Sequence, residues 1–275
     1  FAKAHRKKAI VAISGGLDSA LVAKLAVDAL GHNNVLGIFM PTRFTSKESC
    51  QDARDLAKNL DIQFIEIPID DSYNHFLEIL NPLFDKYGKK TCETSDITEE
   101  NLQARTRAMI LMAFANKYGR LVLNTGNKSE MALGYCTLYG DMVGALSVIG
   151  DVTKTECYQL AAWLNREHES IPKRILEKEP SAELKHHQKD TDTLPPYHII
   201  DQVIKDYVED YKDIHQIATD HNFDIELVHS IIRRIYRAEH KRRQAPPSLR
   251  VSKKSFAIGR KKPLHFTGLT SERVY

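Results

Sequence analysis

The chain has 275 residues, of which 42% are hydrophobic and 27% charged, with a formal net charge of +3 at pH 7. This composition suits one large α/β unit with appendages and excludes a disordered or fibrous chain. No apolar run approaches the roughly 18 residues that a membrane span needs, and no signal peptide is recognisable. The four cysteines contain no C-x-x-C pair, which argues against zinc or dithiol chemistry. We expect a cytoplasmic protein in a reducing compartment.

Strands and helices are predicted to alternate in the first half of the chain. Strands are expected at 9–13, 35–40 and 63–68, and helices at about 19–30 and 46–60. Such alternation is typical of parallel β-α-β units with right-handed crossovers. The strands are almost entirely apolar, as expected when helices cover both faces of a parallel sheet. The predicted fold is therefore α/β, with a doubly wound parallel sheet flanked by helices.

The first strand runs directly into a loop, Ser14–Ser19, with the sequence S-G-G-L-D-S. Glycine lets the backbone approach an anion closely, and the start of the following helix favours negative charge. Asp18 would repel a phosphate unless a cation lay between them, which predicts bound Mg²⁺. The loop lacks the G-x-x-x-x-G-K-[ST] and G-x-G-x-x-G patterns. It resembles the pyrophosphate loop of N-type ATP pyrophosphatases. A plain turn, with Asp18 as a helix cap, is the alternative.

Two helices are expected after the third strand. The first covers 71–87 and is broken at Asn81-Pro82, because proline removes a backbone donor and disturbs the preceding turn. The pair Asp70-Asp71 is interpreted as its N-cap rather than as a metal site. The second covers 98–118, with Thr98 as its cap.

A fourth strand is predicted at 120–124 and ends in a second polar loop, Thr125-Gly126-Asn127. In open α/β sheets, ligands bind outside the carboxyl ends of strands at a topological switch point. Two glycine-bearing strand ends therefore predict a nucleotide site. Further on, Thr153 and Glu156 form a capping box for a helix that extends to about His168.

The C-terminal part is predicted to be helical, at 199–211, 214–222 and 224–240. The last helix has an apolar stripe that faces either the core or a second subunit, formed by Val228, Ile231, Ile232 and Ile235. Before these helices, residues 180–197 are polar and contain prolines, which predicts a loop that is mobile without ligand. We divide the chain into an α/β core at 1–185 and a C-terminal part at 186–275, packed together as one structural unit.

Nine Lys or Arg and no acid lie between Lys241 and Lys262. Such a run is an anion site, a nucleic-acid patch, a solvated end or an arm between subunits. Phe256 is its single aromatic residue, which offers little for base stacking. We expect no nucleic-acid partner.

Six blocks, in this order, resemble the NAD synthetase family, more closely the synthetase part of its glutamine-dependent branch. The blocks are 14–19, 100–105, 125–130, 150–156, 180–184 and 240–243. The resemblance implies an adenine nucleotide alpha hydrolase-like fold with a helical C-terminal extension. It also implies ATP-dependent amidation of deamido-NAD to NAD, through a nicotinyl-adenylate intermediate that releases pyrophosphate and then AMP.

The resemblance assigns roles to individual positions. It implies catalytic roles for Asp18 and Lys154, and Mg²⁺ ligation by Asp18 and Glu130. The residues that would contact ATP are Ser14, Gly15, Gly16, Asp18, Ser19, Thr125, Lys154 and Ser181. Those that would contact deamido-NAD are Asn101, Arg105, Glu130, His240 and Lys241.

Physical reasoning agrees with parts of this assignment. Asn101 and Arg105 are four residues apart and share one helix face, and the guanidinium fork suits a phosphate or carboxylate. Lys154 at a helix start would add a point charge to amides that are already directed at an anion. The structural alternatives are a turn role for Thr125, an exposed acid at Glu130, a structural Lys154, and a surface ion pair for Arg105.

Two positions depart from the ammonia-dependent branch of the family, where a Lys and an Asp correspond to Leu138 and Ala145. Both departures fit the glutamine-dependent branch, which carries a glutaminase domain that is not within these residues. The family also implies a homodimer. Three other functions stay open: another adenylate-forming amidotransferase or thiolase, a non-catalytic nucleotide-binding module, and RNA binding through the basic run.

Overall fold

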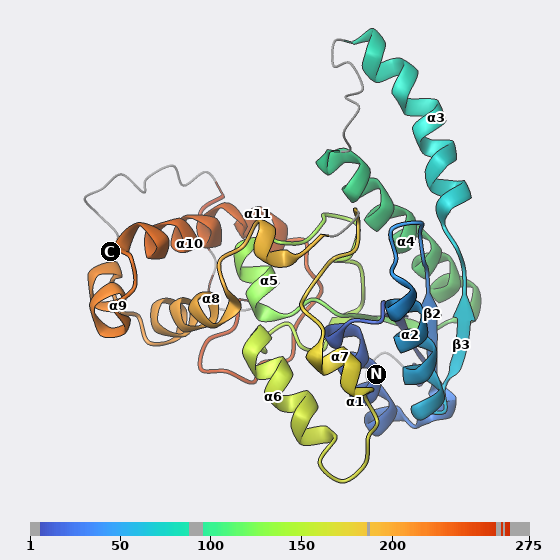
Figure 1. The fold of residues 1–275 in the computed structure, drawn as a ribbon, viewed down its shortest axis with the longest axis horizontal. Coiled ribbons are helices and arrows are strands. Elements are labelled where there is room, and N and C mark those ends of the chain that lie inside the picture. Colours follow the sequence, from blue (N-terminus) through green and yellow to red (C-terminus); the bar gives the residue numbers. More distant parts are fainter. Residues whose placement is uncertain (1–5, 88–95, 186–187, 257–259, 261, 265–275) are drawn as a thin grey trace.

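The computed structural model describes residues 6–87, 96–185, 188–256, 260 and 262–264. Its centre is an all-parallel sheet with the order β3-β2-β1-β4-β5 (Figure 1). The strands are β1 (Ala9–Ile13), β2 (Val35–Phe39), β3 (Gln63–Glu66), β4 (Leu121–Asn124) and β5 (Leu146–Ser147). The chain runs outward from β1 to β3 and then crosses to β4 and β5 on the other side. The doubly wound α/β fold is confirmed, and its switch point lies between β1 and β4.

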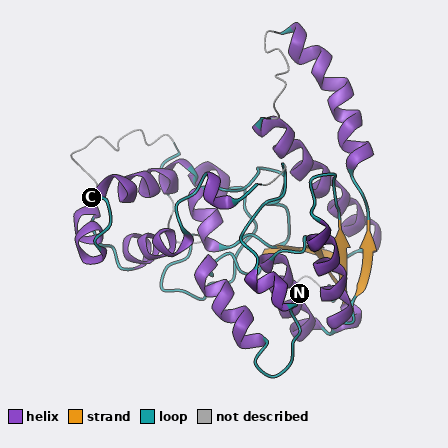
Figure 2. Ribbon diagram, viewed as in Figure 1, coloured by secondary structure: helices purple, strands orange, loops and turns teal. Residues whose placement is uncertain are grey.

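Helices cover both faces of this sheet (Figure 2). One face packs against α1 (Leu17–Leu30), α2 (Lys47–Asn59), α6 (Lys154–Leu164) and α7 (Lys173–Glu177). The opposite face packs against α4 (Ile97–Tyr118). The short strand β5 was not predicted, because two residues give no alternating pattern that a sequence reader could detect.

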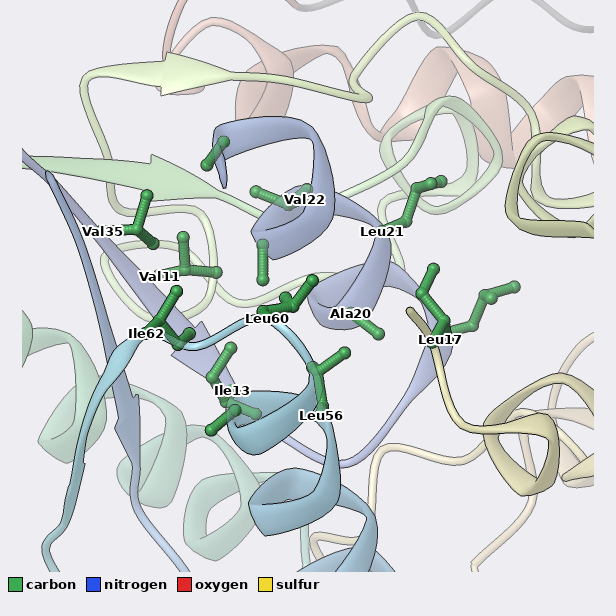
Figure 3. Close-up of a cluster of buried hydrophobic side chains, with 14 of the residues drawn as sticks. Val11, Ile13, Leu17, Ala20, Leu21, Val22, Val35, Leu56, Leu60 and Ile62 are labelled. Carbon is green, nitrogen blue, oxygen red and sulfur yellow. The ribbon is translucent and has the colours of Figure 1, made fainter. Parts of the chain in front are cut away.

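Successive side chains of the strand β1 point to opposite faces of the sheet. Because helices cover both faces, the strand is buried on both sides. Val11 and Ile13 share a cluster with Val22 of α1 and Leu56 of α2 (Figure 3), while Ile10 joins the cluster on the α4 side. Complete burial of a side chain of this size contributes about 1.5–3 kcal/mol. The edge from which the Ser14 loop emerges is therefore a rigid part of the molecule.

The helix α3 (Asp70–Lys86) and the start of α4 project away from the body of the protein (Figure 1). The predicted break at Asn81-Pro82 is wrong, because α3 continues through Pro82. Tyr73 is the one buried residue of this helix, so water can satisfy the carbonyl that Pro82 leaves without a donor. The pair Asp70-Asp71 lies in the first turn, after Ile69 at the N-cap position.

Two other helix ends differ from prediction, and side-chain caps explain both. Asp96, not Thr98, caps α4, since it forms a capping box with Glu99. The helix α6 ends at Leu164 rather than near His168. There the Asn165 side chain donates to the carbonyl of Ile171 at 2.6 Å and accepts that residue's N–H at 3.0 Å, which turns the chain away.

The C-terminal helices form a second core. They are α8 (Tyr197–Ile204), a π-helical segment (Lys205–Glu209), α9 (Ile214–His221), α10 (Ile225–Arg237) and α11 (Glu239–Arg242). The predicted stripe of α10 is buried there, with Ala132 and Leu133 of α5 (Lys128–Leu133) in the same cluster. These helices therefore pack on the α/β part, while the boundary after residue 185 stays a prediction. No helix in the described ranges has the length and apolar character that crossing a bilayer requires.

A fully buried lysine attaches the segment after α11 to the sheet. Lys128 Nζ lies 2.7 Å from Glu209 Oε1 and Ser252 Oγ, and 3.0 Å from Asp151 Oδ1. Asp151 Oδ2 also accepts the N–H groups of Val251 and Ser252, both at 2.9 Å. Charges out of contact with water need such complete pairing, because removal of one partner leaves the other unpaired in a region of low dielectric constant.

Replacement of Lys128 by Ala should therefore lower the free energy of unfolding by about 3–5 kcal/mol, because Asp151 and Glu209 lose their shared cation. The measurement is urea unfolding followed by circular dichroism. Lys24→Ala is the control: Lys24 pairs with Asp28 on the surface of α1, and such a pair contributes about 0.5 kcal/mol. Equal losses in the two variants would contradict this account of the buried network.

Candidate active site

A cavity of about 280 Å³ lies at the carboxyl ends of β1 and β4, at the switch point of the sheet. Its walls include eight of the residues predicted from the sequence: Ser14, Gly16, Asp18, Ser19, Thr125, Glu130, Lys154 and Ser181. Ala104, Ala108 and Leu111 of α4 supply part of its apolar surface. The structure thus brings together residues that lie up to 167 positions apart, Ser14 and Ser181.

The Ser14–Ser19 loop is braced by its own two serines. Ser14 Oγ accepts the N–H of Gly16 at 3.2 Å, and Ser19 Oγ accepts the N–H of Ser14 at 3.1 Å. Ser19 Oγ also donates to the carbonyl of Gly16 at 3.0 Å. Gly16 is the N-cap of α1 and has no side chain to accept from the first-turn amides. Those amides therefore lack a protein cap, as an anion-binding helix start requires.

Gly15 is required by a close approach of α2. Its φ is +78°, and a Cβ atom there would lie 2.3 Å from the carbonyl oxygen of Ser49. Ser49 belongs to the first turn of α2, which is capped by Ser46. Gly15 is not among the residues that line the cavity; its contribution is to let α2 pack directly against the loop.

The N-termini of α5 and α6 are occupied by protein groups, unlike that of α1. In α6 the N–H of Lys154 donates to Ser129 Oγ and that of Thr155 to Asp201 Oδ2, both at 2.8 Å. In α5 the N–H of Lys128 donates to the carbonyl of Val152 at 2.9 Å. The expectation that amides around Lys154 face an anion is therefore wrong. Of these three helix starts, that of α1 has no side-chain cap.

The ammonium of Lys154 lies between two carboxylates that line the cavity. Its Nζ is 2.5 Å from Asp18 Oδ2 and 3.5 Å from Glu130 Oε1. Burial disfavours the ammonium, but Asp18 and Glu130 outweigh that effect and raise the pKa of Lys154. Burial and the charge of Asp18 raise the pKa of Glu130 to about 8, against the opposing influence of Lys154. Lys154 is thus positively charged at neutral pH, whereas burial and Asp18 together disfavour the carboxylate form of Glu130 more than Lys154 stabilises it.

Glu130 has a second, structural role. Its carboxylate accepts the N–H of Asn127 at 3.4 Å, and Asn127 Oδ1 accepts the N–H of Glu130 at 2.9 Å. This reciprocal pair is a capping box. It fixes Glu130 at the start of α5, beside the loop that follows β4. The sequence interpretation as an exposed surface acid does not describe its position.

The carboxylates fit a magnesium ion that shares its coordination with a phosphate. Asp18 Oδ1 is buried and has no hydrogen-bond partner within the described part of the chain. In that same part, no three His, Cys, Asp or Glu side chains converge as a metal cage. Mg²⁺ keeps several waters and is usually bound by one or two carboxylates together with substrate phosphates. Asp18 and Glu130 match that donor set.

The segment that carries Ser181 is fixed to α2 by Glu183. Glu183 Oε1 accepts from Ser46 Oγ at 2.9 Å and from Lys178 Nζ at 2.7 Å. Ser181 lines the cavity, where its hydroxyl donates to the carbonyl of Gln188 and accepts the N–H of Glu183 at 3.2 Å. The mobility predicted for 180–197 stays a prediction, and His186-His187 lie outside the described residues.

The remaining residues predicted to contact deamido-NAD do not line this cavity. Asn101 Oδ1 accepts from Thr137 Oγ1 at 2.7 Å, and Arg105 Nε donates to the carbonyl of Leu138 at 3.2 Å. Lys241 Nζ donates to the carbonyls of Gly134 and Cys136, both at 2.7 Å. His240 is exposed. Arg105 borders a second, shallower cavity with Met109, Met112 and Tyr139.

Arg107 lines the main cavity and was missed by the sequence analysis. Its Nε donates to the carbonyl of Met40 at 3.0 Å, and burial lowers its pKa to about 10, which leaves it charged at neutral pH. Helical spacing could have identified it, since Ala104, Ala108 and Leu111 lie on the same face of α4. Cys136 also lines the cavity, but burial and Asp141 raise its pKa to about 12, so that its thiol stays protonated.

The parallel sheet, with a cavity at its switch point, places the chain in the adenine nucleotide alpha hydrolase-like class of α/β folds. A sequence profile described as NAD synthase matches residues 1–245, and the chain belongs to this family. The resemblance seen in the six sequence blocks is confirmed.

Known relatives agree with this assignment. The chain is 48% identical over 257 residues to a glutamine-dependent NAD(+) synthetase of Synechocystis sp., a match that covers 94% of this chain and 45% of that protein. The structure of this chain is similar to that of the glutamine-dependent NAD+ synthetase from Acinetobacter baumannii in complex with adenosine diphosphate. The TM-score is 0.60 and the identity 38%, and the match covers 96% of this chain and 46% of that one. The NMN synthetase from Francisella tularensis is similar with a TM-score of 0.66, 30% identity, and coverage of 80% and 86%. The chain spans less than half of the glutamine-dependent relatives.

Replacement of Gly15 by Ala should weaken both the fold and nucleotide binding, because the new Cβ would displace the first turn of α2 from the loop. Gly31→Ala is the matched control: its φ is +82°, but nothing lies within 4 Å of the added atom. A positive φ alone costs a residue with a side chain about 1–3 kcal/mol. The affinity for MgATP, measured by calorimetry, and the midpoint of unfolding should both fall further in Gly15→Ala than in Gly31→Ala. Equal effects in the two variants would show that the close approach is unimportant.

Proposed function

We propose that this chain catalyses the ATP-dependent amidation of deamido-NAD to NAD. The observation that carries the proposal is the uncapped start of α1, next to the Lys154–Asp18–Glu130 cluster at the switch point. Family membership and the relatives' names supply the substrate class. The nicotinate carboxylate attacks the α-phosphorus of ATP and pyrophosphate leaves. Ammonia then attacks the carbonyl of the nicotinyl adenylate and displaces AMP.

The chain's own contribution is alignment and charge stabilisation rather than a nucleophile. The first-turn amides of α1, in the loop braced by Ser14 and Ser19, would hold the leaving pyrophosphate. Lys154 would stabilise negative charge on the phosphates, and Thr125 and Ser181 would contact ATP from the facing walls. The segment that carries Ser181, which Glu183 fixes to α2, would keep water from the adenylate, because the adenylate hydrolyses readily.

Asp18 and Glu130 are the residues proposed to hold Mg²⁺. When bound, the ion would neutralise phosphate charge that these carboxylates would otherwise repel. The orphaned Oδ1 of Asp18 supports this assignment. Asn101, Arg105, His240 and Lys241 stay proposed contacts of deamido-NAD. Because Arg105 lies outside the main cavity, its contact requires that the dinucleotide extend across the surface of α4.

The rest of the proposal concerns partners. We propose a homodimer, supported by the exposed side chains of Met109 and Tyr139 beside Arg105. Glutamine-dependent relatives support a glutaminase domain as the ammonia source.

The free thiols of Cys50, Cys136 and Cys157 support a cytoplasmic location, while Cys92 lies outside the described residues. The protonated thiol of Cys136 argues against a thiolase, which needs a reactive cysteine.

One assay tests the reaction: NAD formation from deamido-NAD, MgATP and either ammonium or glutamine. Pyrophosphate release should depend on deamido-NAD, which distinguishes an enzyme from a passive nucleotide-binding module. Nicotinate mononucleotide serves as the rival acceptor, since an NMN synthetase is among the structural relatives. Preference for that mononucleotide, or pyrophosphate release without any acceptor, would contradict the proposed substrate.

Asp18→Asn should abolish adenylate formation while the fold is retained, because the amide cannot supply an anionic ligand to Mg²⁺. Exchange of labelled pyrophosphate into ATP in the presence of deamido-NAD measures this step directly. Asp28→Asn, at an exposed site on the same helix, is the control and should exchange normally. Normal exchange by Asp18→Asn would exclude the metal role.

A further inference from the structure

Asp201 of α8 joins the starts of the two helices that present Glu130 and Lys154. It is 6% exposed, and it is not among the residues that line the cavity. Its Oδ1 accepts from Ser129 Oγ, and its Oδ2 accepts the N–H of Thr155 at 2.8 Å. Ser129 directly precedes Glu130, and Thr155 directly follows Lys154. One buried carboxylate therefore contacts a neighbour of each cavity residue.

The bridge continues through the hydroxyl of Ser129. This hydroxyl donates to Asp201 and accepts the N–H of Lys154 at 2.8 Å. Ser129 is fully buried, so none of these groups can exchange its partner for water. The chain of contacts from α8 to the backbone of Lys154 is continuous and has two independent branches, one through Ser129 and one through Thr155.

The bridge is not needed to start either helix. The helix α5 has its own capping box, formed by Asn127 and Glu130, and α6 has one formed by Thr153 and Glu156. Each box already satisfies first-turn amides locally. What Asp201 adds is a connection between the two helices, which fixes their relative placement rather than their existence.

We propose that Asp201 is a positioning residue that sets the separation of Glu130 and Lys154 through Ser129 and the first amides of α6. The consequence for activity rests on the proposed function, because it assumes that these two residues act on MgATP. The C-terminal helices then determine the geometry of a site to which α8 contributes no lining residue of its own.

Asp201→Asn tests the proposal, because it keeps the size of the side chain but replaces one acceptor by a donor. We expect kcat to fall about 10- to 100-fold, because small misplacements of reacting groups slow a reaction by such factors. The KM for deamido-NAD should stay unchanged. The Mg²⁺ concentration that gives half-maximal rate should rise. Asp206→Asn is the matched control: Asp206 is equally buried, and its partners are His221 and Lys212 in the C-terminal part of the chain. It should lower stability and leave kcat unchanged.

A second variant covers the case in which Asp201→Asn does not fold. Ser129→Ala leaves Asp201 bound to the N–H of Thr155 and removes the branch through Ser129, including the acceptor of the Lys154 N–H. It should also lower kcat, and an unchanged kcat in this variant would overturn the route through Ser129. Where Asp201→Asn folds, the double variant should lose less than the product of the two single losses, since both act in one chain of contacts. Purely multiplicative losses would overturn the route through Ser129.

A binding measurement separates this inference from the proposed reaction. Calorimetry with α,β-methylene-ATP should show weaker Mg²⁺-dependent binding by Asp201→Asn than by Asp206→Asn, whether or not the wild type makes NAD. An inactive wild type with this binding difference would refute the reaction and support the positioning role. An active wild type, with identical kcat, KM and binding in the two variants, would overturn the positioning role alone.

Discussion

The contact between the ammonium of Lys154 and the carboxylate of Asp18 is the interaction on which the site depends. It joins the first turn of α1 to the first residue of α6, two helices that begin 137 positions apart. Neither charge would be stable there alone, because both side chains are largely buried and a lone buried ion is costly. Glu130 completes the cluster from α5, at 3.5 Å. Three helix starts thus converge on one pair of opposite charges.

The same convergence explains which helix can bind an anion. Helix N-termini attract negative charge because their first amides have no partner within the helix. At α6 the first two amides donate hydrogen bonds to the side chains of Ser129 and Asp201, and at α5 the first amide donates to the carbonyl of Val152. At α1 the cap is Gly16, which has no side chain. Of these three helix starts, those of α5 and α6 have protein partners for the amides named here, whereas that of α1 has no side-chain cap.

The C-terminal helices are more than an extension attached to the sheet. Lys128 connects the π-helical segment and the chain after α11 to Asp151, and Asp201 connects α8 to α5 and α6. Both connections are buried, and both end within three residues of a cavity side chain. The C-terminal hydrophobic cluster also includes Ala132 and Leu133 of α5, so both apolar and charged contacts join these helices to the elements that carry the cavity residues.

Much of this protein follows from local sequence alone. The apolar run at β1 and the S-G-G-L-D-S loop predict a strand, a glycine-bearing turn and a helix, because such preferences depend on neighbouring residues. The stripe on α10 predicts its buried face for the same reason. The tertiary structure decided the rest: the close approach of α2 to Gly15, the continuity of α3 through Pro82, and the occupied start of α6. Each of these depends on contacts with distant residues or with solvent, which no local pattern encodes.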